Sequence, residues 1–292
     1  MALDYQTLKN WPFGPVEQTW SQRDTMLYAL ALGCGADSGN ADNLRFVYEE
    51  GLRALPTMAT VLGYPGFWMM QEASGIDWRR VVNGEQRLIL HRPLPTAGRF
   101  IGRSRVTHIT DKGKVGALVV TARELSNAVT GDLLATVQTV TVCRGDGGYS
   151  ATGQPSDEPL PPLPGPPADR SPDDVIDLPT RPETALIYRL VGGDMNPLHA
   201  DPRSAAAAGF ERPILHGLAS FGLVGRAVLA VCCGGDPTRL TALAARYSAP
   251  VFPGETLRTE IWRIGQQAHF RASIPARNAL VLSHGLARCA AA

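Results

Sequence analysis

The sequence predicts an α+β protein made of two similar halves, each with one helix packed against an antiparallel sheet. Three observations support this prediction. A helix-like segment precedes several strand-like segments in each half, sequence signals recur with an offset of roughly 156 to 160 residues, and a proline-rich stretch separates the halves. With 292 residues, the chain is long enough for two units that each bury a core. Side by side, they would form one continuous sheet.

The predicted strands alternate β-branched and polar residues between turn residues. They span 86–90, 100–109, 115–126 and 133–143 in the first half, and 243–248, 256–264, 268–274 and 279–287 in the second. Pro93 and Gly98 in the first half match Pro250 and Gly254 in the second. These residues interrupt strand pairing and favour a turn before a long strand.

The helix of the second half is predicted from Leu218 to Cys233, because this stretch is apolar on nearly every face and should be buried. Its small residues Ala219, Gly222 and Gly225 should allow the sheet to approach closely. The matching stretch in the first half begins at Leu55.

The break between the halves is rich in proline and has no apolar periodicity of a helix or strand. We therefore predict an N-terminal half at 1–147, an extended, semi-rigid linker at 148–182 and a C-terminal half at 183–292.

Composition narrows the function. The chain is 44% hydrophobic and 19% charged, with a net charge of +1 and no run of like charges, so we expect neither a nucleic-acid nor a membrane partner. Residues 1–14 show no secretory signal, and the chain does not end in Ser-Lys-Leu, so we expect a cytoplasmic protein. The five cysteines lack paired CxxC spacing, which favours reduced thiols.

Residues 188–205 hold the strongest candidate for chemistry. Gly192 and Gly193 precede Asp194, and Asn196-Pro197 predicts a bend that can bring Asp194 towards His199. An Asp and a His that share one water form a competent acid–base pair. The alternative is that Asp194 only caps a turn and His199 is a loop or core histidine.

His216 and Gly217 stand at the predicted start of the buried helix, where free backbone N–H groups and the helix dipole favour negative charge. The N–H of Gly217 could stabilise a carbonyl oxygen that gains negative charge. Alternatively, Gly217 serves only tight packing between helix and sheet.

The run Y-x-L-x-G-G-D-x-N-P-L-H-x-D-P from Tyr188, followed by A-G-F-x-R-P-I-L-H-G-L from Ala208, resembles the signature of the hydratase 2 family, the MaoC-like (R)-specific 2-enoyl-CoA hydratases. The resemblance continues in the first half, at LRFVY (44–48), LPT (55–57), GEQ (84–86) and RPLPTAGRF (92–100). These segments also resemble the hydratase part of peroxisomal multifunctional enzyme type 2. Similarity covers nearly the whole chain outside the linker.

The resemblance implies a double hot-dog fold, in which two antiparallel sheets each wrap round a central helix. It implies reversible syn addition of water to trans-2-enoyl-CoA, giving (3R)-hydroxyacyl-CoA, with Asp194 and His199 as the catalytic dyad. It also implies that Asn196 supports the water or the dyad, and that Gly217 donates its N–H to the thioester carbonyl. The resemblance also implies a homodimer that needs no metal or prosthetic group, with the CoA thioester as its substrate.

The first half departs from this pattern. When Tyr28 is aligned with Tyr188, Cys34, Ala36 and Gly39 stand in place of Asp194, Asn196 and His199. The first half has thus lost the dyad, and the resemblance implies that it accommodates the acyl chain. The hydrophobic residues that could line that space are Leu52, Leu55, Met58, Met69 and Met70. Core packing is the more common role for any single one of them.

Phosphates of coenzyme A should meet basic residues, and the candidates by position are Arg203, Arg212 and Arg226. His216 is a further candidate for substrate binding. Four alternatives stay open at this point. They are a hydro-lyase for a branched, steroid-derived or dicarboxylic acyl-CoA, a hot-dog thioesterase, a non-catalytic acyl-CoA binding protein, and a metal site. Asp194, His199 and His216 suit a metal by residue type, but their spacing matches no common zinc pattern, so we expect none.

Overall fold

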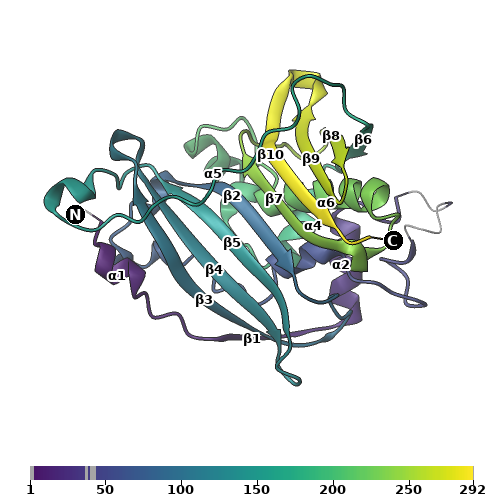
Figure 1. The fold of residues 1–292 in the computed structure, drawn as a ribbon, viewed down its shortest axis with the longest axis horizontal. Helices are drawn as coiled ribbons and strands as arrows, with labels where there is room; N and C mark the ends of the chain where they lie inside the picture. Colours follow the sequence, from purple (N-terminus) through teal and green to yellow (C-terminus); the bar gives the residue numbers. More distant parts are fainter. Residues whose placement is uncertain (1–2, 37–38, 40–43, 292) are drawn as a thin grey trace.

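The computed structural model describes residues 3–36, 39 and 44–291, and these form one antiparallel sheet of ten strands (Figure 1). The strand order is β1-β3-β4-β5-β2-β7-β10-β9-β8-β6. All eight predicted strands are present, with ends shifted by a few residues. The strands are β1 Val16–Trp20, β2 Val81–Leu90, β3 Gly98–Asp111, β4 Ala117–Asn127, β5 Leu133–Cys143, β6 Asp174–Pro179, β7 Leu240–Tyr247, β8 Thr256–Ile264, β9 Gln267–Ile274 and β10 Ala279–Cys289.

The strand order confirms the predicted duplication. Reading inward from either edge gives the same sequence of strands, because β1-β3-β4-β5-β2 in the first half mirrors β6-β8-β9-β10-β7 in the second. The halves meet where β2 pairs with β7, from Glu85 opposite Arg246 to Ile89 opposite Ala242. At this seam the buried carboxylate of Glu85 binds Arg87 at 2.7 Å and Arg246 at 2.9 Å.

Strand β6 corrects the prediction that residues 148–182 contain no strand. It forms the sheet edge, pairs with β8 and turns Ile176 and Leu178 towards the core, while Val175 and Asp177 face solvent. An edge strand leaves its outer backbone unpaired, so a short segment flanked by prolines can occupy it. This short alternation was too weak a pattern to recognise in the sequence.

The rest of the linker lies along the sheet. Figure 1 shows this teal segment crossing from the first half to β6. Arg87 of β2 donates to the Pro161 carbonyl, and Trp262 of β8 donates to the Arg170 carbonyl, so both halves hold it in place.

The helices are unequal in the two halves. They are α1 Tyr5–Lys9, α2 Gln22–Ala31, α4 Thr184–Gly192, α5 Pro202–Ala207 and α6 Gly217–Cys232, and the 3-10 helices are η1 Pro56–Thr60, η2 Trp68–Met70, η3 Glu72–Ser74, η4 Trp78–Arg80, η5 Gly113–Val115, η6 Tyr149–Thr152, η7 Pro197–His199, η8 Pro237–Arg239 and η9 Pro275–Arg277. Helix α6 is the predicted buried helix, and the second half's strands pack around it. In the first half, the 3-10 helix η1 packs against β2, β5 and α6.

The small residues of α6 act differently from the prediction. A Cβ on Gly222 would lie 2.6 Å from the Leu32 side chain, and one on Gly225 would lie 2.6 Å from Thr57. Both neighbours belong to the first half, so these glycines chiefly admit the other half rather than the sheet. On the same seam α2 packs on α4, with the rings of Tyr28 and Tyr188 6.0 Å apart.

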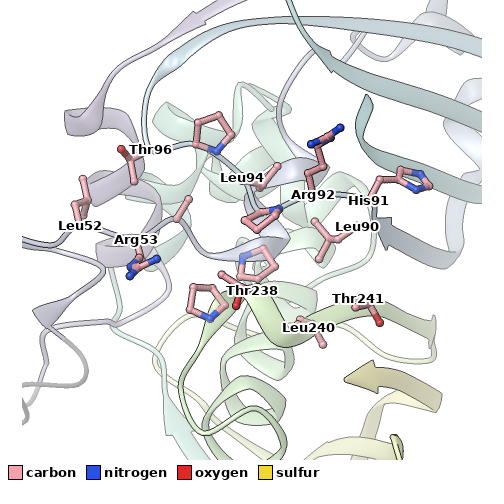
Figure 2. A pocket seen from close by; sticks show the side chains of 15 residues that line it. Leu52, Arg53, Leu90, His91, Arg92, Leu94, Thr96, Thr238, Leu240 and Thr241 are labelled. Atoms are coloured by element: carbon pink, nitrogen blue, oxygen red, sulfur yellow. The ribbon is translucent and has the colours of Figure 1, made fainter. Parts of the chain in front are cut away.

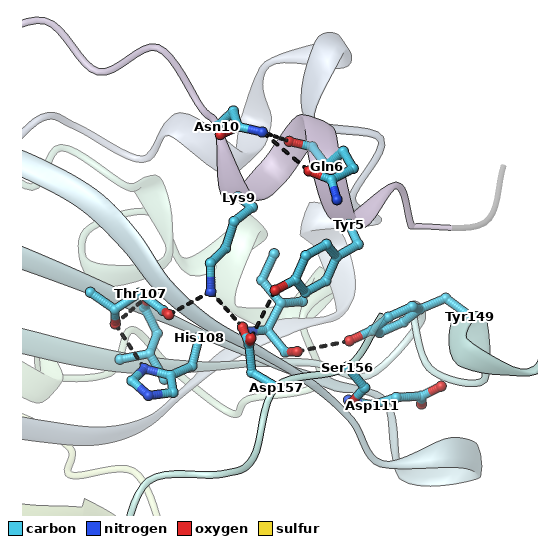
Figure 3. A network of polar contacts seen from close by, with 12 residues as sticks. Tyr5, Gln6, Lys9, Asn10, Thr107, His108, Asp111, Tyr149, Ser156 and Asp157 are labelled. Atoms are coloured by element: carbon cyan, nitrogen blue, oxygen red, sulfur yellow. Dashed lines mark hydrogen bonds and ion pairs between the residues drawn. The ribbon is translucent and has the colours of Figure 1, made fainter. Parts of the chain in front are cut away.

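The N-terminal helix α1 is anchored on the first half by a polar network (Figure 3). The Lys9 ammonium binds Asp157 at 2.6 Å and the Thr107 carbonyl at 2.7 Å, and the Tyr5 hydroxyl donates to Asp157 at 2.8 Å. Asp157 therefore joins α1, strand β3 and the start of the linker. Throughout the described ranges, every helix is too short or too polar to cross a bilayer.

Candidate active site

The Asp194 turn follows the end of α4. Gly193 adopts a left-handed conformation (φ 70°) that glycine reaches without strain, and this ends the helix. The Asp194 side chain then accepts the Asn196 N–H at 3.1 Å, and the Asn196 side chain accepts the Leu198 N–H at 3.0 Å. These two bonds hold the predicted bend, and they place Asn196 as the cap of η7, which carries His199.

The bend brings Asp194 and His199 together. Their closest atoms, Oδ2 of Asp194 and Nε2 of His199, are 3.9 Å apart. This is longer than a direct hydrogen bond and allows one small molecule to contact both atoms. The Asp194 side chain is 45% exposed, whereas that of His199 is 10% exposed. The pair thus joins an accessible carboxylate to a buried imidazole.

The backbone sets the tautomer of His199. Its Nδ1 lies 2.8 Å from the carbonyl oxygen of Ile214, which only accepts hydrogen bonds, so Nδ1 carries the proton. The unprotonated Nε2 then faces Asp194. Burial lowers the pKa of His199, although the bond to Ile214 and the charge of Asp194 oppose this effect. His199 is therefore a neutral base at pH 7.

His216 stacks directly on His199, with ring centroids 3.7 Å apart and planes inclined by 25°. Its Nε2 donates to the backbone carbonyl of Asp194 at 3.2 Å. Burial, and then the neighbouring His199, lower the pKa of His216 to about 4. His216 thus contacts both members of the pair, and its substrate-binding role stays a prediction.

Gly217 is the first residue of α6, where backbone N–H groups have no partner within the helix. A Cβ at this position would lie 3.0 Å from Cε1 of Tyr247, closer than ordinary contact. Gly217 is therefore required for packing against Tyr247, and its N–H stands at the helix end that stabilises negative charge. The packing role of Gly217 against Tyr247 is therefore compatible with a catalytic role of its N–H.

The three predicted arginines lie apart from this cluster or have other partners. The Arg203 side chain is 93% exposed and pairs with Asp201. Arg212 donates to the Pro253 carbonyl and lies over the Phe252 ring. Arg226 donates to the Leu32 carbonyl at the end of α2, and nine residues of helix place it about 13 Å from Gly217. Arg226 thus links the two halves.

Two cavities lie near the seam between the halves. A hollow of about 410 Å³ adjoins the dyad turn, since Leu190 to Gly193 form one wall and Trp20, Val61 and Tyr64 line another. Partial burial, and then the nearby Asp194 carboxylate, raise the pKa of Tyr64 to about 12. Nothing in the sequence pattern pointed to Tyr64, because its contact with the site crosses from one half to the other.

The second cavity, of about 230 Å³, lies at the far end of α6 and is shown in Figure 2. Of the hydrophobic residues predicted to line an acyl space, Leu52 lines this cavity. Leu55, Met58 and Met69 are buried in the cores, and Met70 is 53% exposed. The core role therefore describes three of these five residues.

The cluster around the Asp194–His199 pair also contains three potential metal ligands. One atom from each of Asp194, His199 and His216 lies within 4.8 Å of the other two. However, Nδ1 of His199 and Nε2 of His216 are engaged with backbone carbonyls, which leaves one nitrogen on each ring. Metal-independent chemistry stays a prediction.

A pseudo-symmetric sheet with one Asp–His pair at the seam of its halves defines the class: a double hot-dog protein equipped for acid–base chemistry. A Mycobacterium tuberculosis protein described as having a double hot-dog fold superimposes with a TM-score of 0.55, over 94% of this chain and 93% of that one. At 15% identity, this likeness concerns the fold.

Residues 19–145 match the MFE-2 hydratase 2 N-terminal domain, and residues 165–281 match the MaoC like domain. The chain is 36% identical to a probable enoyl-CoA hydratase 2 of Dictyostelium discoideum, over 98% of this chain and 97% of that protein. It is 31% identical to a MaoC-like dehydratase of Phytophthora capsici, whose crystal structure superimposes with a TM-score of 0.86 over 99% of this chain and 100% of that one. The chain belongs to the MaoC-like hydratase 2 family.

Proposed function

We propose that this protein is an (R)-specific 2-enoyl-CoA hydratase, which adds water reversibly to trans-2-enoyl-CoA and yields (3R)-hydroxyacyl-CoA. One observation carries the proposal. The unprotonated Nε2 of His199 faces the Asp194 carboxylate at 3.9 Å, beside the N-terminus of α6. Similarity to proteins named enoyl-CoA hydratase 2 and MaoC-like dehydratase supports the same reaction.

In the proposed mechanism, a water contacts both Nε2 of His199 and Oδ2 of Asp194. The dyad removes one proton from this water while its oxygen attacks Cβ of the enoyl thioester. The dyad also delivers one proton to Cα on the same face, so addition is syn and the enzyme returns to its starting protonation. Because the two groups are close, they act as one coupled acid–base unit.

The thioester carbonyl gains negative charge as Cβ is attacked. The N–H of Gly217 stands at the start of α6, and the dipole of this 16-residue helix favours negative charge at that point. Asn196 keeps the bend between the dyad residues closed through its bond to Leu198. His216 holds the Asp194 backbone and stacks on His199, and we assign it a positioning role.

The first half is proposed to accommodate the acyl chain. Its 3-10 helix η1 has five residues where the second half has the 16 residues of α6, so less of the interior is filled by helix. The hollow beside the dyad is lined partly by first-half residues, including Trp20 and Tyr64.

We also propose that the protein forms a homodimer and is located in the cytoplasm. Light scattering tests the homodimer, and imaging of a tagged protein tests the location.

The test is the ultraviolet absorbance of the enoyl thioester, followed with crotonyl-CoA and decenoyl-CoA. Hydration removes the conjugated absorbance, and stereospecific dehydrogenases then identify the product enantiomer. An (R) product supports the proposal, and the rate ratio between the chains measures the acyl space. Release of free coenzyme A thiol would instead indicate a thioesterase, and binding without turnover would indicate an acyl-CoA carrier.

A further inference from the structure

Three of the five cysteines form a cluster at the end of α6 opposite the dyad. Cys232 is the last residue of α6, Cys233 follows it as the cap, and Cys289 is the last residue of β10. The Sγ atoms of Cys233 and Cys289 are 3.2 Å apart, and the two residues are 1% and 8% exposed. Since a disulfide bond is about 2 Å long, these sulfurs need to approach by about 1 Å to bond.

Arg239 holds the two chain segments of this pair together. Its guanidinium donates to the Cys233 carbonyl at 3.3 Å and to the Ala290 carbonyl at 3.3 Å. Hydrogen bonds from the thiols of Cys232 and Cys233, and then the charge of Arg239, lower the pKa of Cys289. Cys289 accepts the hydrogen bond within the pair, which favours its thiolate, and the thiolate is the reactive form.

The other two cysteines lack this environment. Burial raises the pKa of Cys34, and burial also raises the pKa of Cys143.

A metal site is also disfavoured in the cysteine cluster. Among the described residues, the group of three side chains placed to hold a metal ion is Asp194, His199 and His216, which contains none of the three cysteines. The geometry fits a bond between two sulfurs.

We propose that Cys233 and Cys289 are a site of reversible disulfide formation by peroxide. The Cys289 thiolate attacks hydrogen peroxide, forming a sulfenic acid and releasing hydroxide, which takes up a proton to become water. The Cys233 sulfur then attacks the sulfenic sulfur, forming the S–S bond and releasing a second water. Two thiols are oxidised and one peroxide is reduced to two waters, and a dithiol reductant reverses the change.

The bond would connect the end of the central helix to the last strand and close a loop across 56 positions. Such a cross-link restricts the unfolded chain, so the oxidised protein should melt roughly 5 to 10 °C higher than the reduced protein. The 16 residues of α6 separate this site from Gly217 by about 24 Å. Hydratase activity should therefore change by less than about two-fold.

Mass spectrometry of the folded, peroxide-treated full chain tests the proposal. Cleavage after arginine should release residues 227–239 linked to the tetrapeptide 289–292. The link should persist in Cys232→Ser and in the matched control Cys143→Ser, and it should disappear in Cys233→Ser and Cys289→Ser. Dithiothreitol should remove it and reverse the rise in Tm.

Three outcomes would overturn the proposal. They are an absent link in the folded wild type, an undiminished link in Cys233→Ser, and a link that forms equally well in urea, where the native contact is lost. Each readout is independent of hydration, so the result does not depend on the proposed enzyme activity.

Discussion

The two halves share one strand order, yet among the residues that the structure describes only the second half carries the Asp–His pair. The same turn follows α2 and α4, since Gly33 (φ 79°) and Gly193 (φ 70°) both end their helices in the left-handed conformation. The next residue differs. Cys34 is buried and apolar, whereas Asp194 projects a half-exposed carboxylate beside the hollow. Duplicated frames can therefore diverge in chemistry at the connections while the sheet stays the same.

The central helices diverge in the same way. Helix α6 starts at Gly217 and provides the N-terminus beside the dyad. In the first half, η1 ends at Thr60, where the buried Arg123 donates to the carbonyls of Ala59 and Thr60. A cation satisfies the last carbonyls of a helix, so Arg123 stabilises this early end. One half has a long helix that starts beside the dyad, and the other half ends its helix early.

The largest expected effect breaks the dyad. Asp194→Asn and His199→Gln should each lower kcat/KM for enoyl-CoA by about 10³-fold or more, because each removes one member of the acid–base pair. Cys34→Ser changes the matching position of the first half and should leave the rate within about two-fold. Steady-state hydration kinetics measure these effects. Equal losses of kcat/KM in Cys34→Ser and Asp194→Asn would contradict the proposal that the second half performs the reaction.

The next effect concerns the start of α6. Gly217→Ala should lower kcat by about 10²-fold, because the new Cβ would lie 3.0 Å from Tyr247 and shift the N–H that is proposed to bind the thioester oxygen. Gly14→Ala is the control, since a Cβ there meets nothing within 4 Å. Unchanged kcat with folded Gly217→Ala would remove this N–H from the mechanism.

The third prediction concerns acid. His216 has a pKa of about 4 when folded and 6.5 as its ordinary value, so the unfolded chain binds more protons between these values. Stability should therefore be complete above pH 6.5 and fall by about 3 kcal/mol as pH drops towards 4. Urea unfolding at pH 7 and 4.5 measures this loss. The loss should shrink in His216→Gln, and an identical pH slope in that variant would place the sensitivity elsewhere.

The smallest effect concerns the seam. Glu85→Gln should destabilise the fold by about 2 kcal/mol, because it removes the buried carboxylate between Arg87 and Arg246. Glu124→Gln removes an exposed pair with Arg105 on the same sheet and should cost less than about 0.5 kcal/mol. Urea unfolding of both variants compares them. Equal costs would mean that the ion pairs at the seam do not strengthen the joint between halves.

Much of the fold could be predicted because its signals are local. The eight strands follow from alternating apolar residues, and α6 follows from a stretch that is apolar on nearly every face. The Asp194 bend follows from the turn preferences of glycine and of Asn-Pro. The resemblance of the motif to the hydratase 2 signature then suggested which residues to pair. Strand β6 escaped because a short edge strand among prolines has little periodicity to read.

By itself, the sequence determined the buried helix and the bend that brings Asp194 towards His199, since each depends on neighbours within a few positions. The recurrence of signals between the two halves determined the duplicated α+β plan. Only the tertiary structure decided the contacts between distant segments. Ile214 sets the His199 tautomer, Arg226 binds Leu32 of the other half, and Cys233 meets Cys289. These contacts depend on how the two halves and the last strand pack, and no local pattern encodes that packing.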